Sequence, residues 1–252
     1  MASVTKARSK RGGGPGGAVQ AAYHHGALKQ ALLEVAESVL LDYGVEGFTL
    51  RECARRAGVS HGAPAHHFGD ARGLLSELTA VSFEQLEALM QDYRARAAPD
   101  GYSQFVATGL AYVDYALAHR ARFQLMFRSD RMDHGNQRLV AAGGRAYSQL
   151  QETLQLVVTQ AKVRSGSLEP KIALAWSMVH GFATLMLDNR QFATVVGGDA
   201  RRAHDLMGEL LMRVRPVFEA GDRPAAPARE TFSATSHRKG AKARRSAQRK
   251  VV

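Results

Sequence analysis

The chain of 252 residues is poor in cysteine, tryptophan and proline, with one, one and seven of each. A single cysteine, Cys53, excludes an internal disulfide and a metal site built from several cysteines. No apolar run approaches the roughly 18 residues that a membrane span needs. The basic, glycine-rich residues 6–17 lack the apolar stretch of a secretory signal. We therefore expect a cytoplasmic protein with no membrane partner.

Acidic residues are scarce at both ends of the chain, where the positive charge collects. The formal net charge is +11, yet residues 1–22 hold four Lys or Arg and no acid, and residues 223–252 hold nine against Glu230 alone. The body between them is nearly neutral. Both ends are poor in large apolar residues, so we expect a disordered basic arm and a disordered basic tail. Such segments attract polyanions of any sequence, or they are solvated tails that aid solubility.

A strand pattern is also missing, because helical periodicity accounts for nearly all of residues 26–220. The length allows one or two domains with a sizeable core. The fold class that we predict is all-α. The longer helices are expected over residues 28–43, 71–96, 102–118, 137–164, 170–186 and 200–219. A break is expected at His119-Arg120, before an apolar group at residues 123–127.

Two short helices joined by a tight turn are predicted after the first long helix. Thr49 is the N-cap of the first, with Glu52 three residues on as a capping box requires. Gly58 ends that helix in the left-handed conformation. Ser60 is the candidate N-cap of the second, to within one or two positions, and Asp70 caps the helix after it. This layout is typical of a helix-turn-helix DNA reader.

Two C-terminal helices carry more apolar surface than a single-sided packing requires. Apolar residues cover nearly the whole circumference of helix 170–186, and a broad apolar stripe follows helix 200–219. A helix that is apolar all round is buried on more than one side. The pair therefore predicts half of an intersubunit four-helix bundle, or the centre of a monomeric bundle.

An apolar ligand pocket with one polar group is a further hypothesis. Its candidate residues are Phe123, Met126, Phe127, Trp176, His180 and Met186. A stripe of methionine and aromatic residues is more often plain core, and His180 is more often a hydrogen-bonded core histidine than a ligand contact. The adjacent pairs His24-His25 and His66-His67 do not share a helix face, so we expect no metal site.

The N-terminal region resembles the TetR-type transcriptional regulators over about residues 22–80. The resemblance rests on Tyr23-His24-His25-Gly26, Phe48-Thr49-Leu50-Arg51-Glu52, Ala57-Gly58-Val59-Ser60, His67-Phe68-x-Asp70 and Leu74-Leu75. Further on, Trp176 followed by His180-Gly181 resembles a subgroup whose ligand domain carries Trp-x-x-x-His-Gly. The resemblance implies an all-helical homodimer. We accordingly expect a disordered arm at 1–22, a helix-turn-helix domain at 23–70, a regulatory and dimerisation domain at 71–222 and a disordered tail at 223–252.

The same resemblance implies DNA-binding roles for particular residues. Thr49 and Arg51 would contact phosphates. The major groove would face Ser60, His61, Gly62, Ala63 and His66. His67 would lie at the edge between groove and backbone, and Phe68 in the domain core.

Two positions depart from the family pattern. Ala65 stands where members usually carry a tyrosine, and Ala71 where they usually carry a lysine, with Arg72 adjacent. Both usual residues contact the DNA backbone, so their loss weakens the grip on DNA unless Arg72 and the basic tails compensate. No Lys or Arg occurs between Arg56 and Arg72. Backbone contacts, DNA shape and the tails are therefore expected to carry much of the affinity.

Three classes of function are compatible with a helical, partly basic chain to different degrees. The first is a transcriptional repressor that binds a palindromic double-stranded operator as a homodimer and responds to a small-molecule effector. The second is an architectural DNA-binding protein without an inducer, which uses its basic tails. The third, an enzyme, lacks support, since no phosphate loop, His-Glu-x-x-His motif or Cys-His arrangement occurs. The first class is our prediction, with no cofactor and no catalytic residue.

Overall fold

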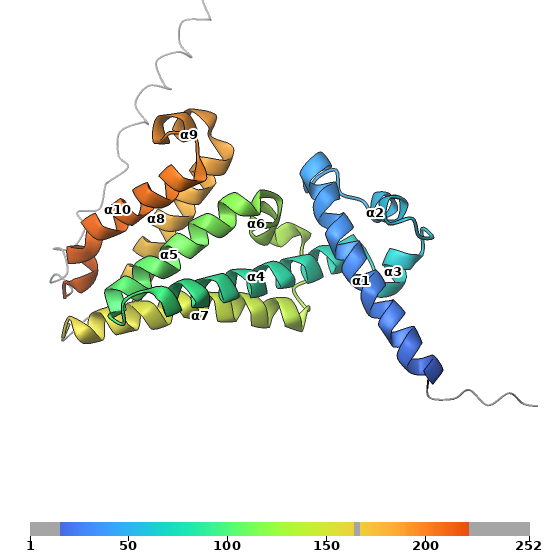
Figure 1. Cartoon of the computed structure of the whole chain (residues 1–252), viewed down its shortest axis with the longest axis horizontal. Helices are drawn as coiled ribbons and strands as arrows, with labels where there is room; N and C mark the ends of the chain where they lie inside the picture. The colour runs from blue at the N-terminus through green and yellow to red at the C-terminus, as the bar shows by residue number, and fades with distance from the viewer. Residues whose placement is uncertain (1–15, 164–166, 222–252) are drawn as a thin grey trace, which may run out of the picture.

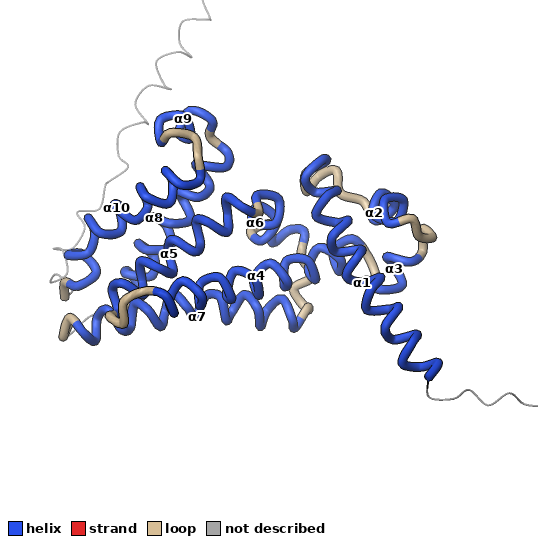
Figure 2. Tube along the Cα trace, viewed as in Figure 1, coloured by secondary structure: helices blue, strands red, loops and turns tan. Residues whose placement is uncertain are grey.

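The computed structural model describes residues 16–163 and 167–221, with side chains from Ala27 onward. The predicted tail, residues 1–15 of the predicted arm and the side chains of Tyr23-His24-His25 lie outside the described residues. Every regular element within the described residues is a helix, as the all-α prediction required (Figure 2). In the same part of the chain, no helix is long and apolar enough to cross a membrane.

Three helices form the N-terminal group at one end of the molecule (Figure 1). They are α1 (Gly16–Tyr43), α2 (Leu50–Ala57) and α3 (Ala63–Phe68). The helix α1 begins earlier than expected. Residues 16–22 are helical, whereas the sequence-based expectation places them in a disordered arm. Residues 18–22 read Ala-Val-Gln-Ala-Ala, and alanine has the highest helix propensity of all residues. That preference outweighs the glycines just before it.

A bundle of longer helices forms the rest of the described chain. The helix α4 (Ala71–Arg96) runs from the N-terminal group into this bundle and packs along α5 (Gly101–Ala118) and α7 (Gln137–Gln160) (Figure 1). On its other side, α5 packs against α8 (Glu169–Asp188) and α10 (Ala200–Glu219). The long helices of this bundle were all predicted, with ends that differ by at most four residues.

Three short elements depart from the sequence-based expectation. The predicted break at His119-Arg120 is the junction at which α6 (Arg120–Met126) begins, and the 3₁₀ turn η1 (Ser129–Arg131) follows it. The helix α9 (Arg190–Val196) was not predicted. Its signals are local, since the Asn189 side chain accepts a hydrogen bond from the Phe192 amide at 3.0 Å. Gly197, at φ 106°, ends it.

One hydrophobic cluster, here called the shared core, joins the N-terminal group to the adjoining end of the bundle. Leu33, Val39 and Leu40 of α1 pack with the first turns of α4, at Leu74, Leu75 and Leu78. The same cluster includes Ala121 and Leu125 of α6 and Met132 after η1. Because buried side chains are close-packed, a shift of α6 or α4 is transmitted to α1.

Candidate nucleic-acid interface and cavity

The two ends of α2 have the cap residues that the sequence predicted. Thr49 is the N-cap of α2, and its hydroxyl accepts a hydrogen bond from the Glu52 amide at 3.2 Å. Gly58 has φ 65° in the left-handed region, and the Val59 amide donates to the Ala54 carbonyl at 3.1 Å. These bonds satisfy backbone groups that a helix end leaves open. They set the direction in which the chain enters α3.

The N-cap of α3 differs from the candidate named from the sequence. The helix begins at Ala63 with Gly62 as its cap, and no side chain caps it. Ser60 lies too early, and its carbonyl accepts from the Ala63 amide at 3.0 Å in the preceding turn. The reason is the buried Pro64, which lacks an amide proton and so has to occupy the first turn. Asp70, by contrast, caps α4 as predicted and accepts from the Gly73 amide at 2.9 Å.

Gly58→Ala tests the turn between α2 and α3 directly. A side chain in the left-handed region costs about 1–2 kcal/mol, and we expect the free energy of unfolding to fall by about that much in a urea titration. Gly62→Ala is the matched control, because Gly62 has φ −82° and a Cβ there meets no atom within 4 Å. Equal losses in the two variants would contradict the assigned backbone role of Gly58.

The residues predicted to face the major groove, together with His67, lie on this turn and on α3. Ser60, His61, Gly62 and His66 are exposed, and Ala63 and His67 are half-buried. The His66 and His67 rings meet edge to face with centroids 5.5 Å apart. Phe68 packs on the N-terminal part of the shared core, in keeping with its predicted place.

Among the basic residues of α2, Arg51 differs from its neighbours. Arg55 and Arg56 both bind the Glu52 carboxylate, at 2.6 Å and 2.8 Å. Hydrogen bonds from the two guanidinium groups lower the pKa of Glu52 to about 2. Arg51 is exposed and has no hydrogen-bond or ion-pair partner among the described residues. Its charge is therefore the one on α2 that is available to a phosphate.

Arg72 is tied to the bundle, which the sequence did not indicate. Its guanidinium donates to the Met132 carbonyl, through Nε at 3.1 Å and through Nη. The predicted use of Arg72 as a substitute for the missing lysine therefore competes with this bond, although a guanidinium has five N–H donors. Arg72 joins the start of α4 to the segment before α7.

Ion pairs link the N-terminal group to α6 and η1. Arg122 of α6 binds Glu37 of α1 at 2.5 Å. Arg128 binds Glu46, in the connector between α1 and α2, at 2.6 Å, and Arg131 binds the same carboxylate. These pairs join α1 and the connector before α2 to the segment that runs from α6 to η1.

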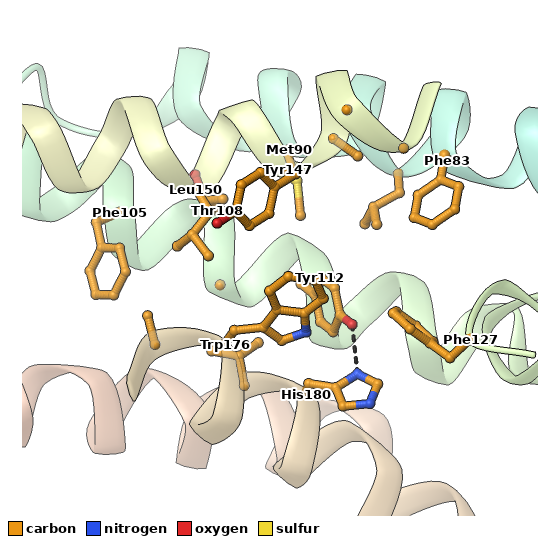
Figure 3. A pocket seen from close by; sticks show the side chains of 17 residues that line it. Phe83, Met90, Phe105, Thr108, Tyr112, Phe127, Tyr147, Leu150, Trp176 and His180 are labelled. Carbon is orange, nitrogen blue, oxygen red and sulfur yellow. Dashed lines mark hydrogen bonds between the residues drawn. The ribbon is translucent and has the colours of Figure 1, made fainter. Parts of the chain in front are cut away.

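A cavity of about 450 Å³ lies between α4, α5, α7 and α8 (Figure 3). It is partly open to solvent, because its lining residues Phe127, Tyr147 and Trp176 are 36%, 36% and 41% exposed. No Lys, Arg, Asp or Glu occurs among its lining residues. The lining consists of Phe83, Leu86, Met90, Phe105, Thr108, Gly109, Tyr112, Phe127, Gly143, Gly144, Ala146, Tyr147, Leu150, Ala175, Trp176, Val179 and His180. The volume falls in the range of about 300–1,000 Å³ that is usual for small-molecule sites.

The six predicted pocket residues do not all reach this cavity. Phe127, Trp176 and His180 line it. Phe123 does not line it, but its ring packs against that of Phe127, with the two ring centroids 5.2 Å apart. Met126 and Met186 do not line it and are buried in hydrophobic clusters.

Sequence reasoning missed the contribution of α4, α5 and α7. The side chains concerned include Phe83, Tyr112 and Tyr147. Their apolar spacing on the helices is the same as that of ordinary core residues, so no local signal separates a cavity wall from a packed interface.

One hydrogen-bonded pair forms the polar part of the cavity wall. The Tyr112 hydroxyl and His180 Nδ1 are 2.8 Å apart (Figure 3). Burial lowers the pKa of His180, which favours the neutral imidazole. Burial also raises the pKa of Tyr112, while a hydrogen bond from Trp176 acts against that rise. The wall is therefore uncharged at neutral pH, with a hydroxyl, an indole and an imidazole close together.

Two family models match the chain. Residues 32–78 match the model described as bacterial regulatory proteins of the tetR family. Residues 105–211 match the model described as the tetracyclin repressor-like C-terminal domain. The first covers the helix-turn-helix and the start of α4, and the second covers most of the cavity wall. No protein of curated function matches the chain in sequence.

Solved structures show the same fold. A protein of unknown function from Rhodococcus sp. RHA1 is 31% identical, with a TM-score of 0.63 over 76% of this chain and 96% of that one. The TetR family transcriptional regulator PfmR from Thermus thermophilus is 18% identical, with a TM-score of 0.57 over 77% and 96%. The ketosteroid transcriptional regulator KstR2 of Mycobacterium tuberculosis is 17% identical, with a TM-score of 0.53 over 75% and 93%. Together with the two family models, these likenesses show that the chain belongs to the TetR family of bacterial transcriptional regulators.

Proposed function

We propose that this protein is a transcriptional repressor that binds a palindromic operator as a homodimer and releases it when a small molecule occupies the cavity. The observation that carries the proposal is the combination of an exposed turn and α3 with an apolar cavity, connected by α4. The first turns of α4 pack with α1 through Leu74 and Leu78, and its next turns line the cavity through Phe83, Leu86 and Met90. The protein acts by binding, without catalysis, in the cytoplasm where its operator lies. Trp176 and His180-Gly181 support its place in the Trp-x-x-x-His-Gly subgroup.

In this proposal DNA is held by two kinds of contact. Thr49 and Arg51 bind phosphates, and Arg72 joins them if it releases the Met132 carbonyl. The major groove is read by Ser60, His61, Gly62, Ala63 and His66, with His67 at the edge. Ala65 and Ala71 lack the side chains that would make two further contacts with the DNA backbone. A two-fold dimer then requires half-sites about 34–36 Å apart or a multiple of that distance.

The dimer is supported by the apolar surface of α8 and α10. Leu174 and Leu185 of α8 are 39% and 42% exposed, and Val217 of α10 is 54% exposed. Between them, Met178 and Val214 are half-buried and continue the surface. Exposed apolar patches of this kind mark protein interfaces. A second copy covers them in a four-helix arrangement.

The regulatory step follows from the position of Phe127. This residue lines the cavity and ends α6. The next residue, Arg128, binds Glu46 of the connector before α2. An effector that displaces Phe127 moves Arg128 and the connector with it, and so changes the placement of α2 and α3. The architectural alternative has no use for the cavity, which is why the effector-responsive function is preferred.

Two single substitutions separate backbone contacts from base contacts. Arg51→Ala is expected to weaken binding to operator and to random DNA alike, by about tenfold, because a phosphate contact carries no sequence information. His61→Ala is expected to change which operator variants are preferred. Both are measured by fluorescence anisotropy on an operator obtained by selection from random DNA.

Arg55→Ala is the matched control for Arg51→Ala. It removes the same charge from the same helix, but Arg55 is already paired with Glu52. We expect its effect to stay below about threefold. Equal losses on operator and random DNA for His61→Ala would show that His61 does not read bases.

A further inference from the structure

We propose that the effector is an uncharged, largely apolar molecule with aromatic or flat hydrocarbon rings and a single hydroxyl or carbonyl group, which binds beside Tyr112. This inference rests on the proposed function and names the chemistry of its effector.

The first argument is the complete absence of charged side chains from the wall. None of the seventeen lining residues is Lys, Arg, Asp or Glu. An ion that enters such a site loses part of its hydration without gaining a charged partner from the wall, which is unfavourable. Carboxylates, phosphates, thioester conjugates with charged carriers, and ammonium ions are therefore all disfavoured. A neutral molecule has no such penalty.

The second argument is the charge state of His180. His180 is the lining residue whose charge state changes nearest to neutral pH. It is half-buried and its Nδ1 lies 2.8 Å from the Tyr112 hydroxyl. Since burial lowers its pKa, the imidazole supplies no positive charge to an anionic effector. The Tyr112–His180 pair is therefore a neutral polar spot, which can form hydrogen bonds but carries no charge.

The third argument is the shape of the remaining wall. Aromatic rings come from all four enclosing helices, with Phe83 from α4, Phe105 and Tyr112 from α5, Tyr147 from α7 and Trp176 from α8 (Figure 3). The Tyr147 and Trp176 rings lie 5.5 Å apart between centroids. Ring faces and edges pack well against other flat rings. The polar spot at Tyr112 then accommodates one hydrogen-bonding group of the bound molecule.

The test compares three probes of one shape and different charge. They are biphenyl-4-methanol, biphenyl-4-carboxylate and biphenyl-4-methylammonium, titrated at pH 7.5 into the full chain without DNA. Trp176 is the single tryptophan of the sequence and lines the cavity, so its fluorescence reports occupancy. We expect the alcohol to bind at least about tenfold more tightly than either ion, a difference of about 1.4 kcal/mol.

Three variants test where the alcohol binds and which side chain contacts its hydroxyl group. Ala146→Leu enlarges a lining side chain of α7 and is expected to weaken binding of the alcohol at least fivefold, whereas Ala141→Leu, on the exposed side of the same helix, leaves it unchanged. Tyr112→Phe is expected to weaken the alcohol but not unsubstituted biphenyl. Thermal unfolding of each variant confirms that it is folded.

Either ion binding as tightly as the alcohol would overturn the inference, as would the absence of a saturable response to the alcohol or an unchanged affinity in Ala146→Leu. These outcomes are distinct from failure of the proposed function. Binding of the alcohol as expected, without any effect on operator binding, would contradict the regulatory proposal and leave the chemistry of the cavity standing.

Discussion

Replacing both Leu174 and Leu185 with glutamate is expected to convert the proposed dimer into a monomer and to lower operator affinity by at least about 100-fold. The two side chains are 39% and 42% exposed on α8 and lie on the apolar surface that the partner covers in our proposal. Each dimer would bury four additional carboxylates of like charge, which is unfavourable without partners. The monomer then binds a single half-site. It loses the high effective concentration at which a dimer presents its second DNA-binding domain to the other half-site.

Sedimentation velocity gives the oligomeric state of this variant, and anisotropy on a two-half-site operator gives its affinity. Val140→Glu is the control. Val140 is 59% exposed near the start of α7 and is not part of the apolar surface of α8 and α10, so the same chemical change there should leave both measurements unaltered. A double variant that remains dimeric would show that subunits associate through another surface.

Glu37→Ala is expected to lower the free energy of unfolding by about 3 kcal/mol, because it leaves a buried guanidinium without its counter-charge. The Arg122 side chain is 10% exposed and that of Glu37 is 25% exposed. Arg122 keeps a hydrogen bond to Gln85 at 2.8 Å, while its Nε has no partner among the described residues. Removing the carboxylate therefore breaks the main compensation for burying this charge between α1 and α6.

Urea unfolding measures this loss. Glu34→Ala, one turn earlier on α1, removes an exposed carboxylate that bonds only Gln30 among the described residues, and should change the free energy of unfolding by less than about 0.5 kcal/mol. A loss of the same size in the two variants would show that the Arg122–Glu37 pair contributes no more than a surface pair. The double variant Glu37→Ala, Arg122→Leu should recover part of the loss, since an apolar replacement needs no partner.

Local signals predicted the helices well, and the exceptions have local causes. Thr49 and Asp70 accept hydrogen bonds from the amides three residues on, so the helix starts at these two positions could be predicted from a few neighbouring residues. Ser60 has the same capping chemistry, but Pro64 moves the first turn of α3 and leaves Gly62 as its cap. In α1 the alanines of residues 18–22 override the glycines before them.

The candidate DNA-contacting surface could be predicted in position but not in its electrostatics. The exposure of Ser60, His61 and His66 follows from the turn itself. Which arginines are available does not, because Arg55 and Arg56 share Glu52 and Arg72 binds the Met132 carbonyl. The last of these contacts joins residues 60 positions apart. Periodicity within a helix carries no information about such a pair.

The amino-acid sequence by itself determined the helical class, the helix-turn-helix and the apolar excess of α8, since each depends on spacings within one segment. Only the tertiary structure decided that Phe127, Trp176 and His180 share a cavity with Tyr112 while Met126 and Met186 do not. The physical reason is that a cavity is the space left where four helices fail to fill their common interior. That space depends on how side chains from distant segments pack together, and no single segment contains it.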